Sequence, residues 1–345
     1  MKNLGCWPEA LPIVVEYGRS PTLGHPVPED EDNIIAALKQ SRRISSIRLT
    51  ITTSLLKKFS IVKGLFPELA DLVVMSQDSW RVTLPSALRW GPRLRTLYLT
   101  RVTFPALLKL LTSFINLVHL QLHGVLDDSN VSPHVLTRAF SGMAQLQSLS
   151  LLLSTGHHAA LPQPLRGRVV FPALTHFDFQ GTCTYLDDFV ARIDAPRLED
   201  IGLTFFKQLL HLRQLRMFVD RISMHKSYSR ADIQFSGHAA FISFTQPAPS
   251  ATCLKLHVHH QSSDVQLFSV AQICHHSAFM SGVEDLRISA ASASNVQDSS
   301  QRCPVLPLHS FQYQHRESPI ARFHLVVSFD LPRSCYLRRQ FERRR

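Results

Sequence analysis

Histidine and cysteine are the residue types in this sequence that could bind a metal ion. The chain holds 18 histidines and six cysteines, and both are densest between Cys253 and His276. Zinc takes closely spaced Cys and His ligands that converge tetrahedrally, and Cys253 with His257 has a usable spacing. However, Cys253 lies beside strand-like leucines, and Cys274 falls on the apolar face of a predicted helix. Since free cysteine is among the most buried residue types, we expect buried thiols, surface histidines and no metal site.

The sequence carries no motif for covalent catalysis or phosphate binding. It lacks the G-x-S-x-G elbow of serine hydrolases, the glycine-rich loops that cradle phosphates and the H-E-x-x-H pattern of zinc proteases. Three adjacent acidic pairs remain as candidates for acid–base chemistry: Asp127-Asp128, Asp187-Asp188 and Glu199-Asp200. Neighbouring side chains on a strand point to opposite faces, so we interpret these pairs as solvated charges in loops or at helix starts. We therefore expect a protein that is not an enzyme and takes no cofactor.

Charge and hydropathy argue against two further classes of partner. The net charge is +11, but residues 301–345 hold nine Lys or Arg and three Asp or Glu, which leaves only +5 on the other 300 residues. We therefore expect no nucleic-acid partner. We interpret the basic end, Arg338 to Arg345, as a solvated terminus, with a nuclear address or an RNA-binding tail as alternatives. No signal peptide and no uninterrupted apolar span is visible, so we expect no membrane partner and a cytoplasmic or nuclear location.

A spaced apolar phrase recurs along the chain and predicts the elements that must position any site. It consists of an apolar residue, two residues, an apolar residue, one residue and a third apolar residue. The copies are Ile44/Ile47/Leu49, Leu69/Leu72/Val74, Leu94/Leu97/Leu99, Leu117/Leu120/Leu122, Leu146/Leu149/Leu151, Leu174/Phe177/Phe179 and Leu198/Ile201/Leu203. Successive copies start 23 to 29 residues apart, within the period of a leucine-rich repeat. Weaker copies follow at Ile233/Phe235, Leu254/Leu256 and Val283/Leu286/Ile288.

Proline and helical periodicity define the rest of each period. Four phrases have a proline two residues before their first apolar residue: Pro67, Pro92, Pro172 and Pro196. Because proline cannot donate to a sheet ladder, each phrase is predicted to be a loop followed by a strand. Apolar residues recur at helical spacing in 186–193 and 215–222, and a first helix is predicted over Ile34 to Gln40. These features predict an α/β fold, a curved leucine-rich-repeat-like solenoid of about nine or ten degenerate repeats, with a parallel sheet on the concave side and helices on the convex side.

Several segments together resemble a known protein family, the F-box-associated leucine-rich-repeat proteins of mushroom-forming fungi. The segments are Trp7, 11–17, 28–41 (PEDEDNIIAALKQS), 90–99 (WGPRLRTLYL), 190–203 (VARIDAPRLEDIGL) and 218–233 (FVDRISMHKSYSRADI). The resemblance spans roughly residues 7–290. It implies an F-box that docks to Skp1 in a cullin (SCF-type) ubiquitin ligase, followed by a repeat region that recruits a protein substrate.

The N-terminal segment departs from an F-box, which shapes the expected domains and partners. Leu11-Pro12 is followed by a strand and a turn instead of amphipathic helices, so we expect this chain alone not to bind Skp1. We expect a strand and loop in 1–27, the solenoid in 28–290, and a Ser-rich then basic, partly disordered tail in 291–345, with at most one strand at 323–329. The predicted function is that of a monomeric, non-catalytic protein-interaction scaffold, resembling the substrate-recognition region of an F-box adaptor. The alternative is a free-standing repeat protein with no ubiquitin-ligase link.

The register of the phrases predicts which side chains face away from the core. Phrase residues point inward, so the residues between them point to the concave face, where rows from neighbouring strands stack. Six of these residues combine aromatic, polar and charged groups in one amphipathic patch: Tyr98, His119, Gln121, His123, His176 and Asp178. Because aromatic residues often anchor interfaces, we predict that this patch binds a protein substrate or partner.

Overall fold

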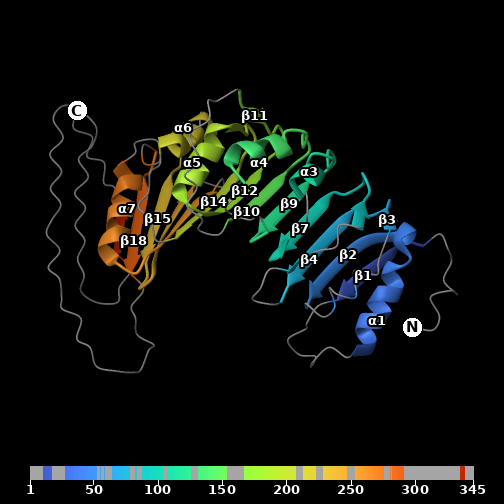
Figure 1. The fold of residues 1–345 in the computed structure, drawn as a ribbon. Helices are drawn as coiled ribbons and strands as arrows, with labels where there is room; N and C mark the ends of the chain where they lie inside the picture. The colour runs from blue at the N-terminus through green and yellow to red at the C-terminus, as the bar shows by residue number, and fades with distance from the viewer. Residues whose placement is uncertain are drawn as a thin grey trace, which may run out of the picture.

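A computed structural model provides the fold of this chain. It describes residues 11–17, 28–52, 55, 58, 64–77, 82–83, 88–103, 107–125, 131–153, 167–206, 213–222, 228–246, 253–275, 280, 282–290 and 335–338. Within these residues, one large sheet runs through the whole molecule and carries helices along it (Figure 1).

The main sheet is open and mostly parallel. Its strands are β1 (Ile13–Tyr17), β2 (Ile44–Ile51), β4 (Asp71–Ser76), β7 (Thr96–Thr100), β9 (His119–His123), β10 (Ser148–Leu152), β12 (His176–Gly181), β14 (Asp200–Phe206), β15 (Arg230–Phe235), β16 (Ala239–Thr245), β17 (Cys253–His259), β18 (Asp285–Ala290) and β19 (Cys335–Arg338). Their order is β1-β2-β4-β7-β9-β10-β12-β14-β17-β16-β15-β18-β19. Nine of the twelve pairings are parallel. The predicted α/β class and parallel sheet are confirmed.

The residues of the apolar phrases stack in register from strand to strand. Leu72 of β4 pairs with Leu97 of β7, which pairs with Leu120 of β9, and the row continues through Leu149 and Phe177. All five side chains are buried. The recurring phrase therefore predicts the pairing register correctly, because each copy enters its strand through the same turn.

Short strands link the connecting segments of neighbouring periods. The pairs are β3 (Gly64–Phe66) with β6 (Leu88–Trp90), β5 (Val82–Thr83) with β8 (Val102–Thr103), and β11 (Val169–Val170) with β13 (Ile193–Asp194). Directly after β6, the backbone N–H of Gly91 donates to the carbonyl oxygen of Phe66 at 3.0 Å. The segments that connect successive strands of the main sheet thus contact each other through their backbones, in addition to the pairing within the main sheet.

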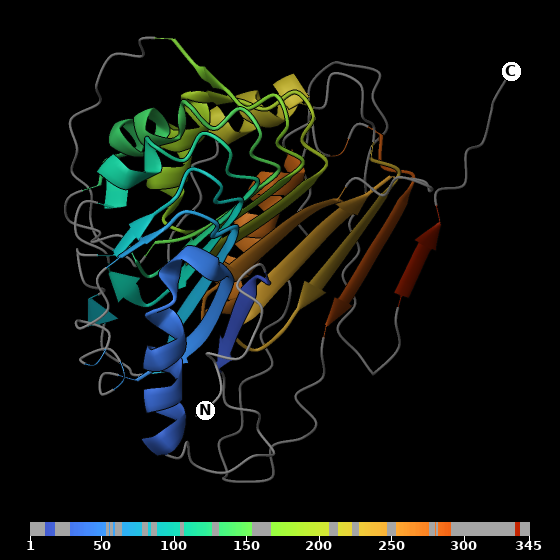
Figure 2. The ribbon, with the colours of Figure 1, turned by 90° about the vertical axis from the view of Figure 1, so that its right-hand side faces the viewer.

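Helices cover one face of the main sheet. They are α1 (Pro28–Leu38), α3 (Leu107–Leu111), α4 (Pro133–Phe140), α5 (Cys183–Ala191), α6 (Arg213–Ile222) and α7 (Ser263–His275), with a short 3-10 helix η2 (Ser41–Arg43). Their buried side chains, such as Leu136, Phe189 and Phe218, join the same apolar core as the phrase residues. Figures 1 and 2 show α4, α5 and α6 together on this side. The opposite face, which none of the described helices covers, carries the alternate strand residues, and we call it the polar face.

The first helix differs from its prediction, whereas α5 and α6 confirm theirs. It begins at Pro28 rather than Ile34 and ends at Leu38, so the acidic run 29–32 lies inside its first turns. Proline is favoured at the first helical position, and carboxylates stabilise the positive end of the helix dipole. Both effects extend the helix toward the N-terminus.

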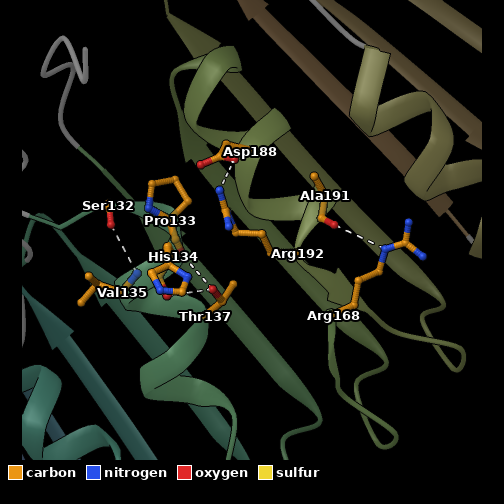
Figure 3. A network of polar contacts seen from close by, with 9 residues as sticks. All are labelled: Ser132, Pro133, His134, Val135, Thr137, Arg168, Asp188, Ala191 and Arg192. Atoms are coloured by element: carbon orange, nitrogen blue, oxygen red, sulfur yellow. Dashed lines mark hydrogen bonds and ion pairs between the residues drawn. The ribbon is translucent and has the colours of Figure 1, made fainter. Parts of the chain in front are cut away.

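The acidic pair Asp187-Asp188 does not lie in a loop or at a helix start, as predicted, because both residues lie well within α5 and hold neighbouring groups. Asp187 Oδ1 accepts the backbone N–H groups of Gln214 and Leu215, at 2.7 and 2.9 Å, and so caps the start of α6. Asp188 pairs with the buried Arg192 guanidinium at 2.9 Å (Figure 3). Of the other acidic pairs, Glu199-Asp200 lies at the start of β14, and Asp127-Asp128 lies outside the described residues.

The start of α4 and the end of α5 are also held by polar contacts (Figure 3). Ser132 Oγ caps α4 by accepting the Val135 N–H at 3.3 Å. Arg168 Nε donates to the carbonyl oxygen of Ala191, at the last position of α5, over 3.4 Å. The contacts labelled in Figure 3 are therefore structural, on the helical side of the molecule.

The regular strand order breaks after β14, where the structure departs from the predicted series of parallel strands. The strand at the weaker phrase Ile233/Phe235, β15, does not pair with β14. Instead β17 pairs with β14, and β16 lies antiparallel between β17 and β15. Because short connections join β15, β16 and β17, they form a meander that turns back toward β14.

The two ends of the chain contribute single strands to the main sheet. β1 pairs with β2, so the predicted N-terminal strand is present. β19, which the sequence did not predict, pairs antiparallel with β18. The predicted strand at 323–329 lies outside the described residues, and partial disorder of 291–345 stays a prediction. In the described part of the chain, no helix is long and apolar enough to cross a membrane.

Candidate interaction face

The six predicted patch residues all lie on the polar face. On β7, β9 and β10, buried core residues alternate strictly with partly exposed ones, which confirms the predicted inward–outward register. The row across the middle of the sheet is Tyr98, Gln121, Ser150, Asp178, Gly202 and Lys255. The predicted role of the patch in binding stays a prediction.

A continuous chain of hydrogen bonds crosses β9, β10 and β12. Gln121 Nε2 lies 3.2 Å from His123 Nδ1, and His123 Nε2 lies 2.8 Å from Ser150 Oγ. Ser150 Oγ donates to Asp178 Oδ2 at 3.1 Å. Since an amide nitrogen only donates and a carboxylate only accepts, the direction is fixed. Gln121 donates to Nδ1, the Nε2–H of His123 donates to Ser150, and Ser150 donates to Asp178.

This direction requires a neutral His123. Burial lowers the pKa of His123, although the Asp178 carboxylate nearby acts in the opposite sense. The neutral imidazole keeps its proton on Nε2 and leaves Nδ1 as the acceptor for Gln121.

The same direction opposes serine nucleophile chemistry. In a catalytic triad, the histidine accepts the serine proton and a carboxylate orients the histidine. Here His123 donates to Ser150, and the carboxylate accepts the serine proton instead. The arrangement can present a fixed pattern of acceptors and donors, which suits recognition.

Gly202 positions the Asp178 carboxylate. The two residues pair across β12 and β14, and a Cβ atom at Gly202 would lie 2.5 Å from Asp178 Oδ1. The carboxylate therefore lies across the glycine backbone, with Oδ2 toward Ser150 and Oδ1 toward β14. A side chain at position 202 would displace it.

Four aromatic rings lie beside this network, on β14, β16 and β17. Phe206 stacks on His259 with ring centroids 5.3 Å apart. Phe241 meets His257 edge-on at 4.5 Å and His259 at 6.5 Å. We call Phe206, Phe241, His257 and His259 the ring cluster. Sequence reasoning treated the histidines only as surface residues, because the antiparallel strand that brings Phe241 to them was not predicted.

The ring cluster and Asp178 belong to one electrostatic environment. The pKa of His257 is lowered, mainly by burial and further by His259 and Lys255, while Asp178 acts to raise it. Asp178 thus acts on the pKa of both His123 and His257, which lie two strands away from β12 on opposite sides of it.

Three of the predicted residues stay outside the hydrogen-bond chain. Tyr98 and His119 lie on the same face beside Gln121 and Ser148 but take no part in it. His176 is exposed, and its Nδ1 lies 2.8 Å from Thr175 Oγ1. The structure therefore divides the predicted patch into a connected half, with Gln121, His123 and Asp178, and a separate half.

The cysteine and histidine segment that first suggested a metal lies along β17 and α7. Among the described residues, no group of three or more His, Cys, Asp or Glu side chains is placed to hold a metal ion. Cys274 packs against the core, and burial raises its pKa to about 11. A thiol with that pKa is a poor nucleophile and a poor metal ligand at neutral pH.

Comparisons with known proteins returned no match: no family model, curated protein or solved structure is significantly similar to this chain.

Proposed function

We propose that this protein is a non-catalytic protein-interaction scaffold that binds its partner on the polar face. The observation that carries this is the hydrogen-bond chain from Gln121 to Asp178, on a sheet face that none of the described helices covers. In this proposal the molecule is a curved leucine-rich-repeat-like solenoid, with the polar face as its concave side and the helices on its convex side.

The composition of the polar face supports this function. Protein interfaces are enriched in aromatic side chains and depleted of charge at their centres. The face offers Tyr98 and the ring cluster, and its acids on β15 and β18 are already paired: Arg230 binds both carboxylate oxygens of Asp232 at 2.8 Å. Half-buried polar groups held by neighbours also lose little side-chain entropy when a partner binds.

The resemblance to F-box-associated proteins suggests a cellular role. In that role the polar face would recruit a substrate to a cullin ubiquitin ligase. The second candidate is a free-standing repeat protein with no ligase link, and the strand β1, where an F-box sequence would continue into helices, favours it. Size-exclusion chromatography of the purified chain with Skp1 separates the two: a stoichiometric complex at micromolar concentration supports the adaptor role, and separate elution supports the free-standing protein.

The binding face is tested by a double variant. Tyr98→Ala with His123→Ala should leave the cooperative melt intact, because neither side chain belongs to the core, and should reduce the proteins retained in a quantitative affinity purification. The matched control replaces two exposed apolar residues of the helical side, Val135→Ala with Met217→Ala. If the control variant retains fewer proteins and the face variant retains as many as the wild type, the partner binds the helical side and the proposal is wrong.

A further inference from the structure

We infer that Asp178 is the anchor for an arginine side chain of the protein partner. This rests on the proposed function and deepens it, because it names the group that the polar face recognises. The inference draws on three features: the unused capacity of the carboxylate, the aromatic rings on the nearby strands and the neutral state of the two neighbouring histidines.

The carboxylate of Asp178 is oriented but far from saturated. An ionised carboxylate can accept about four hydrogen bonds. Among the described side chains, Ser150 alone donates to it, through Oδ2. Oδ1 lies over Gly202, where no side chain covers it from β14. The donors of the network all point toward Asp178, so an incoming ligand must supply further donors, which means a cation or an N–H group.

The ring cluster selects arginine among the possible cations. Asp178 on β12 and His257 on β17 are separated by one strand and offset by two residues along the strands, which places their backbones about 12 Å apart. A guanidinium can bind a carboxylate with two parallel hydrogen bonds, and it stacks on aromatic faces, whereas an ammonium does neither as well. Residues of the partner beside this arginine would cover Phe241 and Phe206, which are both partly exposed.

The charged and titratable neighbours give the inference its sharpest test. His123 and His257 both have a lowered pKa, so at neutral pH they do not oppose a cation. Lys255, across Gly202, is exposed and positive, and it weakens the attraction. Removing its charge must therefore strengthen arginine binding, whereas it would weaken the binding of an acidic ligand.

The experiment titrates the full chain with N-acetyl-arginine methylamide and follows the Gly202 amide and the His123 and His257 ring signals by NMR. The uncharged citrulline analogue is the matched ligand control. We expect saturable shifts with arginine, an affinity at least tenfold lower in Asp178→Asn, and loss of binding in Gly202→Ala. Lys255→Met should bind two- to fivefold more tightly, as estimated for one exposed charge at this separation. Asp232→Asn, which changes an acid already paired on the same face, should bind like the wild type.

Three results would overturn the inference. These are equal shifts with citrulline, unchanged affinity in Asp178→Asn, or binding of N-acetyl-glutamate methylamide that Lys255→Met abolishes. Because Gly202→Ala could disturb the strand, circular dichroism of each variant accompanies the titration, and Asp178→Asn carries the conclusion by itself. If arginine does not bind but Tyr98→Ala with His123→Ala still loses its partner, the anchor is wrong and the proposed function stands.

Discussion

Replacing Gly91 by alanine tests whether successive turns of this fold contact each other through their backbones. Gly91 is buried, and a Cβ atom there would lie 2.7 Å from the Pro67 carbonyl oxygen and 2.8 Å from both the Phe66 carbonyl oxygen and Pro67 Cα. None of these backbone atoms can rotate away as a side chain could. Overpacking costs about 1–3 kcal/mol, so we expect the upper end, about 3 kcal/mol.

Hydrogen exchange measured by mass spectrometry locates this effect. A loss of about 3 kcal/mol corresponds to exchange roughly a hundredfold faster. It should be confined to peptides from β3 to β7, because the close contacts of Gly91 are with Phe66 and Pro67, at the end of β3. Peptides from β14 and β17 should exchange as in the wild type.

Two other glycines serve as matched controls. Gly237 has nothing within 4 Å of its Cβ position, so Gly237→Ala should change stability by less than about 0.5 kcal/mol. Gly167 also has free space but a φ of +77°, so Gly167→Ala isolates backbone strain, about 1 kcal/mol. If Gly91→Ala costs no more than Gly237→Ala, the close contact between successive turns does not exist.

Three further predictions follow from single groups. Asp187→Ala removes the cap of α6, so exchange in 213–222 should become about fivefold faster, a loss of about 1 kcal/mol, whereas Asp187→Asn should retain most of the protection. Folding lowers the pKa of His123 and of His257, so the unfolded state binds more protons than the folded state as the pH falls through about 6.5. The free energy of unfolding, measured by denaturant titration, should therefore fall between about pH 7 and pH 5. The variant His123→Asn with His257→Asn should show a smaller slope of unfolding free energy against pH. Cys274, with its pKa raised to about 11, should be alkylated by iodoacetamide at pH 8 about a hundredfold more slowly than an ordinary thiol, and a normal rate in the folded protein would contradict its burial.

Local spacing was sufficient to predict the strands of the main sheet from β2 to β14 and their pairing register. Leu97, Leu120 and Leu149 follow one recurring phrase, and a phrase with fixed spacing enforces both strand position and pairing register. The row that carries Gln121 and Asp178 could be predicted for the same reason. The hydrogen bonds within that row could not, because they depend on rotamers and proton positions that spacing does not specify.

The second half of the fold depends on long-range pairing that leaves little trace in the sequence. The strands β15 and β17 are apolar at alternate positions, as expected, but nothing in that alternation says which of them lies next to β14. β16 has the same alternation as its neighbours and differs only in direction, which depends on the short connection before it. The position of Phe241, and with it the ring cluster, was therefore beyond sequence reasoning.

In the proposed function, this break in strand order changes what the polar face can recognise. Parallel strands in constant register place side chains at equal intervals. Two stretches of such a face have the same backbone geometry and differ only in which residue types they carry. At the meander, Phe241 arrives from a strand of opposite direction and meets His257 and His259 in an arrangement that the parallel repeats do not reproduce. Specificity is a difference in affinity between partners, and a locally distinct surface discriminates between them better than a repeated one.

The strand β14, where the order breaks, is also the neighbour of β12, which carries Asp178. The Asp178 carboxylate accepts a hydrogen bond from Ser150 and occupies the space that a side chain at position 202 would fill. In the proposed function, recognition is expected to concentrate where the parallel strand order breaks, because a fixed acceptor and an irregular aromatic surface lie there on nearby strands of one face.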